Sequence, residues 1–159
     1  MAKEKAKAAA KSAGKRIKPA AKPIAKPAKP AKPVKKAKAA GVQLVDNRPE
    51  DQYVGINRHP KATESGTIEG AKNLPNGWIT VNGGGEFRNK AQLEQLHKVA
   101  NVSTSGDQIN FCNTGHWASV GWFASSELLG NKKARMYDGS MVEWTMLKGG
   151  SVEQKVKLQ

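Results

Sequence analysis

The sequence predicts an α/β fold, with a mainly parallel central sheet and helices on both of its faces, preceded by a disordered basic tail. Three observations lead to this prediction. Short apolar and β-branched runs alternate with segments of helical periodicity over residues 41–159. Turn-forming residues separate these segments. Residues 1–40 have a low-complexity composition that cannot build a core.

The predicted tail covers residues 1–40. It holds 14 of the 27 Lys and Arg residues but only one acid, Glu4, and the rest of the chain carries 13 basic and 12 acidic side chains. Proline interrupts helices and the lysines repel one another, so an extended, solvated segment is expected. Such a segment could attach to nucleic acid or another anionic surface without sequence preference, or it could serve only as a solubilising spacer.

The predicted domain covers residues 41–159 and opens with a strand at 42–45. That apolar run ends in the polar turn Asp46-Asn47-Arg48-Pro49, as a buried strand does. A second strand is expected around residues 71–74. A helix is expected over 89–101, because Leu93, Leu96 and Val99 recur at helical spacing.

The C-terminal half repeats the alternation of strand and helix. We expect a strand at 108–112, a turn at 113–115 and a helix over 116–129 that Gly130 ends. A strand at 134–137 follows. Ser140 and Glu143 have the spacing of a capping box, which would begin a short last helix. Parallel sheets in such folds bind ligands at the carboxyl ends of their strands.

Composition excludes several classes of protein. A chain of 159 residues with one cysteine has no internal disulfide and no four-cysteine metal site, which favours a reducing compartment. No apolar stretch approaches the roughly eighteen residues of a membrane span, and the N-terminus lacks the apolar core of a signal peptide. We therefore expect a cytoplasmic protein without a membrane span. The sequence leaves the oligomeric state open.

Cys112 is the candidate catalytic residue. A lone cysteine is more often a buried small apolar residue than a nucleophile. Cys112, however, ends a predicted strand and precedes a short turn into a helix. Backbone N–H groups of that turn and the positive end of the helix would surround its sulfur and favour the thiolate over the thiol. The same nest of N–H groups would hold a persulfide.

Four strings of residues, in order and at matching spacing, resemble the rhodanese-domain sulfurtransferases, in particular the catalytic domain of thiosulfate and mercaptopyruvate sulfurtransferases. They are Val45-Asp46-Asn47-Arg48, Gly66-Thr67-Ile68-Glu69-Gly70-Ala71, Cys112-Asn113-Thr114-Gly115-His116-Trp117-Ala118 and Asp138-Gly139-Ser140-Met141-Val142-Glu143-Trp144. The similarity extends over about residues 42–147 and implies a rhodanese-like fold.

The resemblance implies that sulfane sulfur is carried as a persulfide on Cys112. The donor would be a small molecule such as thiosulfate or mercaptopyruvate, the acceptor would be cyanide or a thiol, and no cofactor is implied. Asp46 and Arg48 match a family pair that we interpret as structural support for their turn. The substrate-binding residues implied around the sulfur are Asn113, Thr114, Gly115, His116, Trp117 and Ala118.

The chain departs from the family pattern around the donor. Asn113 and Thr114 are neutral where thiosulfate enzymes carry basic residues, and Gln52 stands where an arginine is frequent. Arg58 or Lys61 would have to supply the missing charge. Thr67 also replaces a common histidine of the family. These departures leave the identity of the donor open.

Histidine and tryptophan residues give weaker predictions. His116 could help to bind an anionic donor and Trp117 could shield the persulfide, or both side chains could point away while only their N–H groups face the sulfur. His59 and His97 are expected to be surface or packing residues, and no metal site is predicted.

Three other functions share features with this sequence. A cysteine phosphatase or arsenate reductase needs an arginine six residues after the nucleophile, where this chain has Ala118. A non-catalytic rhodanese-like module could bind a partner or carry sulfur without turnover, although the presence of Cys112 counts against it. A nucleic-acid-binding protein that uses the tail is compatible with enzyme activity.

Overall fold

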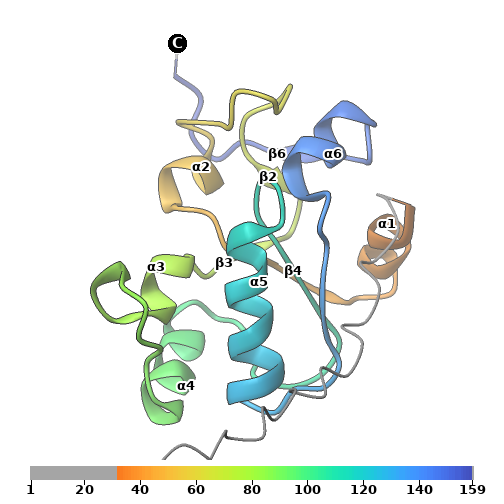
Figure 1. Cartoon of the computed structure of the whole chain (residues 1–159). Helices are drawn as coiled ribbons and strands as arrows, with labels where there is room; N and C mark the ends of the chain where they lie inside the picture. The colour runs from red at the N-terminus through yellow and green to blue at the C-terminus, as the bar shows by residue number, and fades with distance from the viewer. Residues whose placement is uncertain (1–31, 159) are drawn as a thin grey trace, which may run out of the picture.

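The computed structural model of the chain describes residues 32–158, and the predicted disorder of residues 1–31 lies outside this part (Figure 1). Helices and strands alternate through most of the described chain. Their bounds are α1 Lys32–Ala39, β1 Gln43–Asp46, α2 Glu50–Val54, β2 Thr67–Ile68, β3 Lys72–Asn73, α3 Asn76–Ile79, the 3-10 turn η1 Val81–Gly83, α4 Lys90–Val99, β4 Gln108–Phe111, α5 His116–Phe123, the π-helical turn η2 Ala124–Leu128, β5 Ala134–Met136, α6 Ser140–Met146 and β6 Val152–Glu153.

Four strands form one parallel sheet in the order β3-β1-β4-β5. The register pairs Leu44 with Ile109 and Asp46 with Phe111, so β1 and β4 end side by side. A small antiparallel pair, β2 and β6, lies near these carboxyl ends, in the upper part of Figure 1. The parallel α/β fold predicted from the alternation of strand and helix is confirmed, and its carboxyl edge is where ligands bind in such sheets.

Helices cover both faces of the sheet, as predicted. On one face, Leu44, Ile109 and Phe111 join an apolar cluster with side chains of α1 and α6. On the other face, Val45 packs in a cluster with side chains next to and within α4, and a third cluster joins α3, α4, α5 and η2. Successive residues of a strand point to opposite faces, which explains why Leu44 and Val45 enter different clusters.

Helix α1 lies before the predicted domain boundary. The composition assigns residues 32–40 to the tail, but Val34 is 2% exposed, Ala37 is 8% exposed, and both belong to the apolar cluster of α6. The Lys38 ammonium also forms a 2.6 Å ion pair with Glu69. Helix α1 therefore packs against the domain, although it precedes the start predicted at residue 41.

The beginning of α6 differs from the predicted capping box. Gly139 is the N-cap residue, and Ser140 lies in the helix with a positive φ of 49°. The Ser140 hydroxyl donates to the carbonyl of Tyr137 at 2.7 Å, and the Glu143 carboxylate accepts from the Tyr137 hydroxyl at 2.8 Å. The side chains of Ser140 and Glu143 therefore both bond to Tyr137 rather than cap the helix reciprocally.

Helix α5 ends earlier than predicted. The expected helix over 116–129 consists of α5 followed by the π-helical turn η2, and Gly130 follows with φ +81°, as a residue that ends a helix does.

None of the helices within residues 32–158 has the length and apolar character needed to cross a membrane.

His97 gives the domain a predicted sensitivity to acid. Its ring is 1% exposed, Nδ1 lies 2.8 Å from the Leu93 carbonyl, and Nε2 is buried without a partner among the described residues. Burial lowers the pKa of His97, and the hydrogen bond to Leu93 opposes that effect only in part. The packing role expected for this residue is confirmed.

We expect the free energy of unfolding to fall as the pH drops below about 6.5, the ordinary histidine pKa. Below that pH the unfolded state binds a proton on His97, whereas the folded state does not, because burial lowers the pKa of His97 in the folded state. The free energy of unfolding then changes by at most about 1.4 kcal/mol per pH unit. Urea unfolding between pH 7.5 and 5.5 measures this slope. A His97→Gln variant should show a smaller slope, and an unchanged slope would contradict the assignment to His97.

Candidate active site

Cys112 lies at the carboxyl edge of the parallel sheet, between β4 and α5. Its side chain is 1% exposed, and three residues separate it from His116, the first residue of α5. Gly115 is the N-cap of α5 with φ +88°, a left-handed conformation that turns the chain sharply into the helix. The first N–H groups of a helix have no acceptor within it, so α5, which begins four positions after Cys112, has unused donors and the positive end of its dipole at its N-terminus.

Ser140 links the cysteine to α6. The backbone N–H of Cys112 donates to the Ser140 hydroxyl oxygen at 3.0 Å, and that oxygen lies 3.9 Å from Cys112 Sγ. Backbone bonds from Met141 N–H and Val142 N–H to the carbonyls of Cys112 and Asn113 add to this link. Ser140 is fully buried, so the start of α6 fixes one side of the cysteine.

Gln52 contacts the residue that follows the cysteine. The Asn113 amide donates to Gln52 Oε1 at 2.8 Å, which connects α2 to residues 112–115, the sulfur loop between β4 and α5. Asn113 is buried, and its Oδ1 has no hydrogen-bond partner among the described residues. The side chains that meet on this side of the cysteine are therefore uncharged amides.

A pocket of about 400 Å³ lies between Thr114 and α6. It is lined by Thr114, Asp138, Gly139, Val142, Glu143, Met146 and Leu147. Asp138 also lies against Gly115, so closely that a Cβ on Gly115 would overlap Asp138 Oδ1. Burial and the Glu143 carboxylate together raise the pKa of Tyr137, so its hydroxyl stays a neutral donor to Glu143.

Asp46 and Arg48 form a buried ion pair at the end of β1. Arg48 donates to both oxygens of Asp46, with a closest distance of 2.6 Å, and also to the carbonyl of Gly66 at 2.7 Å. The Thr67 hydroxyl donates to Asp46 at 2.7 Å. The pair joins the turn after β1 to the start of β2, as structural support would, and the described contacts of its charged groups are with these elements.

Six of the residues predicted to bind substrate lie together in the structure, next to Cys112. Asn113, Thr114, Gly115, His116, Trp117 and Ala118 form the loop and the first turn of α5. His116 is exposed with Nδ1 3.2 Å from the Thr114 hydroxyl oxygen, Trp117 is half-buried and Ala118 is buried.

Arg58 and Lys61 lie on the segment between α2 and β2. The Arg58 guanidinium donates to the Ala62 carbonyl, and its side chain lines a second pocket, with residues that include Glu64 and Lys157, rather than the one beside Thr114. Lys61 is exposed, and its backbone N–H donates to His59 Nδ1. Neither cation is among the described hydrogen-bond partners of the sulfur loop.

The site combines a buried cysteine, placed between a parallel strand and the first turn of a helix, with the buried pair Asp46 and Arg48 at the end of β1. A comparison of the chain with models of protein families agrees with this arrangement. The family model of the rhodanese-like domain matches residues 30–147 of this chain. The chain belongs to the rhodanese-like domain family. The match includes α1, in agreement with the packing of Val34 and Ala37 in the core.

The sequence of this rhodanese-like domain is similar to parts of longer proteins. A thiosulfate sulfurtransferase of Corynebacterium glutamicum is 34% identical over 114 residues, which is 67% of this chain and 36% of the relative. The sulfur carrier protein TtuD of Thermus thermophilus is 35% identical over 113 residues, or 67% of this chain and 39% of that protein. The chain spans less than half the length of these curated relatives.

A solved structure shows the same fold. The Tum1 protein from Saccharomyces cerevisiae superposes with a TM-score of 0.65 at 25% identity, covering 80% of this chain and 45% of that one. The chain is therefore similar to this protein in its three-dimensional fold.

Three contacts around the cysteine of the rhodanese-like domain were not predicted as parts of the site: those of Ser140, Gln52 and Asp138. Ser140 and Asp138 lie in a string that the resemblance singles out, and this was the available signal. Gln52 differs from the family pattern, and its sequence position alone does not indicate a contact with Asn113.

Among residues 32–158, no three His, Cys, Asp or Glu side chains lie together as metal ligands would.

Proposed function

We propose that this rhodanese-like domain is a sulfurtransferase that carries sulfane sulfur as a persulfide on Cys112. The observation that carries the proposal is the position of this buried cysteine, at the carboxyl edge of the sheet and the N-terminal end of α5. Backbone N–H groups and the helix end stabilise negative charge there, both on a thiolate and on the outer sulfur of a persulfide.

With thiosulfate as the donor, the Cys112 thiolate attacks the outer sulfur. A new sulfur–sulfur bond forms, the donor's own sulfur–sulfur bond breaks, and sulfite leaves with that bonding electron pair. With mercaptopyruvate the carbon–sulfur bond breaks instead, and the carbon takes the proton of the thiol to give pyruvate. Cyanide or a thiolate then attacks the outer sulfur and restores the Cys112 thiolate.

Ser140 and Gly115 have positioning roles in this scheme. The Ser140 hydroxyl accepts the Cys112 N–H and lies 3.9 Å from Sγ, so it fixes the cysteine against α6. Gly115 lets the chain turn into α5. The family relatives that are named thiosulfate sulfurtransferase support sulfur transfer in general, and we propose the cytoplasm, a reducing compartment, as the place where the free thiol works.

The test is the intact mass of the protein after incubation with thiosulfate and, separately, with mercaptopyruvate. We expect a gain of one sulfur atom that cyanide removes and that a Cys112→Ser variant does not show. The donor that produces the gain is then a donor of this enzyme. No gain with either compound would contradict a sulfurtransferase that uses these donors.

A second function is favoured by the relative named a sulfur carrier protein. In that case the domain would hold sulfur or bind a partner without turnover on small molecules, and residues 1–40 would attach it to a nucleic acid or another polyanion. Loading without release to cyanide or a small thiol would favour this alternative over catalysis.

A further inference from the structure

Gln52 is the residue through which helix α2 reaches the sulfur loop. Its Oε1 accepts a hydrogen bond from the Asn113 side-chain amide at 2.8 Å. Among residues 32–158 this is the only hydrogen bond of the Asn113 side chain, and Asn113 Oδ1 is buried without a partner. A peptide bond joins Asn113 directly to Cys112, so a contact that fixes Asn113 acts on the neighbour of the reacting sulfur.

The backbone of the same two residues is held from the side of α6. The Cys112 carbonyl accepts the Met141 N–H at 3.0 Å, and the Asn113 carbonyl accepts the Val142 N–H at 3.1 Å. The Ser140 hydroxyl accepts the Cys112 N–H. The backbone before α5 is therefore tied to α6, whereas the Asn113 side chain is tied to α2.

Helix α2 is itself anchored by other parts of the chain. It is five residues long and none of its residues is buried, so its own packing contributes little to its position. The Tyr53 hydroxyl donates to the Ala71 carbonyl at 3.0 Å. The Val54 carbonyl accepts the N–H groups of Lys155 and Val156 at 3.0 and 2.9 Å. Both anchored residues of α2 directly follow the glutamine, so its side chain starts from a fixed backbone.

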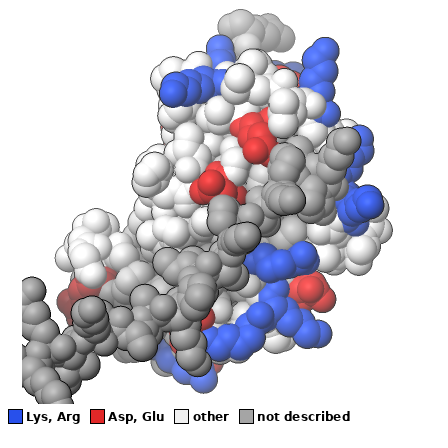
Figure 2. All heavy atoms as spheres, turned by 45° about the vertical axis from the view of Figure 1, so that its right-hand side comes forward, with Lys and Arg blue, Asp and Glu red and all other residues white. Residues whose placement is uncertain are grey.

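The contact between the two amides is uncharged. Charged side chains are spread over the side of the molecule that carries α1 and α6 (Figure 2). In contrast, neither Gln52 nor Asn113 carries a charge, so a change of Gln52 to methionine removes the acceptor and leaves the net charge unchanged. Methionine is unbranched like glutamine and can fill the same space. The effect of this change should therefore not depend on salt.

We propose that Gln52 is a positioning residue for sulfur transfer and that it acts on Cys112 through Asn113. The inference rests on the proposed function and adds a residue to the machinery of that site. A buried amide that loses its acceptor is costly to leave unpaired. Asn113 is 5% exposed, so its side chain reaches water only when the sulfur loop moves. That movement displaces Cys112 and the N–H groups that follow it.

The experiment follows the loading of sulfur onto the full chain at several concentrations of thiosulfate, or of mercaptopyruvate where only that donor loads the protein. In Gln52→Met we expect the maximal loading rate to fall by about tenfold or more, because a small displacement of a reacting group is costly in rate. The half-saturating donor concentration should change by less than about twofold, because a positioning residue does not contact the donor.

Gln95→Met is the matched control. Gln95 is exposed on α4, which lies well away from α2 in Figure 1. The substitution is the same and the sulfur loop is untouched, so this variant should load at the wild-type rate. Equal losses in the two variants would contradict a specific role for Gln52.

A second background assigns the effect to Asn113. In an Asn113→Ala protein Gln52 has no donor left to hold, so adding Gln52→Met should slow loading by less than about a further twofold. A general loosening of α2 would instead slow loading equally in both backgrounds. NMR supplies a readout that needs no activity. Exchange of the Asn113 side-chain amide with water should be at least about tenfold faster in Gln52→Met than in the wild type.

The outcomes separate this inference from the proposed function. A wild-type protein that neither donor loads would overturn the proposed function. Equal maximal rates in wild type and Gln52→Met would overturn the positioning role alone, and so would a higher half-saturating concentration at an unchanged maximal rate, which marks direct contact with the donor. Where a variant fails to fold, the wild-type Asn113 side-chain amide must still exchange more slowly than that of the exposed Asn82, and equal exchange would overturn the contact.

Discussion

Replacing Gly115 by alanine is expected to slow the loading of sulfur onto Cys112 by about a hundredfold or more in a protein that still folds. Gly115 has φ +88°, and a Cβ there would overlap Asp138 Oδ1 and lie 3.2 Å from the Asp138 carbonyl oxygen. Either the Asp138 carboxylate or the start of α5 must shift to relieve the overlap, and the nearby Asp138 carbonyl leaves little room for the shift. Shifts of about 1 Å at reacting groups cost roughly that factor in rate. Intact mass recorded against time measures the loading.

Gly130→Ala is the matched control for this prediction. Gly130 has a similar φ of +81°, but nothing lies within 4 Å of the position that its Cβ would take, and it follows η2 at the far end of the same helical segment. Both variants therefore introduce a left-handed alanine, and only one disturbs the sulfur loop. Equal loading rates in the two variants would show that the contact with Asp138 has no bearing on the cysteine.

Replacing Arg48 by methionine is expected to lower the free energy of unfolding by about 3–5 kcal/mol, as the loss of one partner of a buried ion pair does. Arg48 and Asp46 have side chains that are 1% and 0% exposed. The variant leaves the Asp46 carboxylate with the Thr67 hydroxyl and the backbone N–H of residue 48, and it leaves the Gly66 carbonyl without the guanidinium. Chemical denaturation measures the loss, which is a large part of an ordinary domain's stability.

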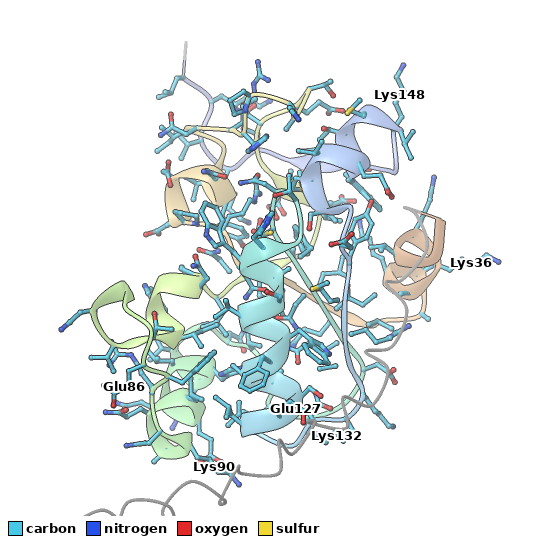
Figure 3. All side chains as sticks on the ribbon, in the orientation of Figure 1. Lys36, Glu86, Lys90, Glu127, Lys132 and Lys148 are labelled. Atoms are coloured by element: carbon cyan, nitrogen blue, oxygen red, sulfur yellow. The ribbon has the colours of Figure 1, made fainter. Side chains whose placement is uncertain are left out.

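Lys132→Met controls for the removal of a basic side chain. Lys132 pairs with Glu127 at 2.7 Å, but both groups are well exposed, at the end of the molecule opposite α6 in Figure 3. Exposed pairs contribute little, because water and salt screen them. We expect its unfolding midpoint to stay close to that of the wild type. A similar midpoint for Arg48→Met would contradict a structural role for the buried pair.

Local patterns were sufficient for the elements that surround the cysteine. The apolar run before Cys112 and the glycine after it predicted β4 and the start of α5, because strand formation and a left-handed turn depend on neighbouring residues. The location of Cys112 at the carboxyl edge followed from the parallel sheet. These elements are confirmed, whereas the chemical role of Cys112 stays a prediction.

Long-range contacts explain what the sequence did not reveal. Helix α1 has the lysine-rich composition of a tail, and only tertiary packing of Val34 and Ala37 distinguishes it. Ser140 and Cys112 are 28 positions apart, so no local rule connects them, and the capping-box spacing pointed elsewhere. The bond between Gln52 and Asn113 spans 61 positions and depends on how α2 approaches the loop.

The packing of α1 also determines where the basic N-terminal segment joins the domain. α1 and α6 pack in one apolar cluster on the same face of the sheet, away from α3 and α4 (Figure 1). Any ligand that the residues before Lys32 bind would be linked covalently to the domain at this face. A link of this kind raises the effective concentration of the ligand for the domain as a whole, with no new contact.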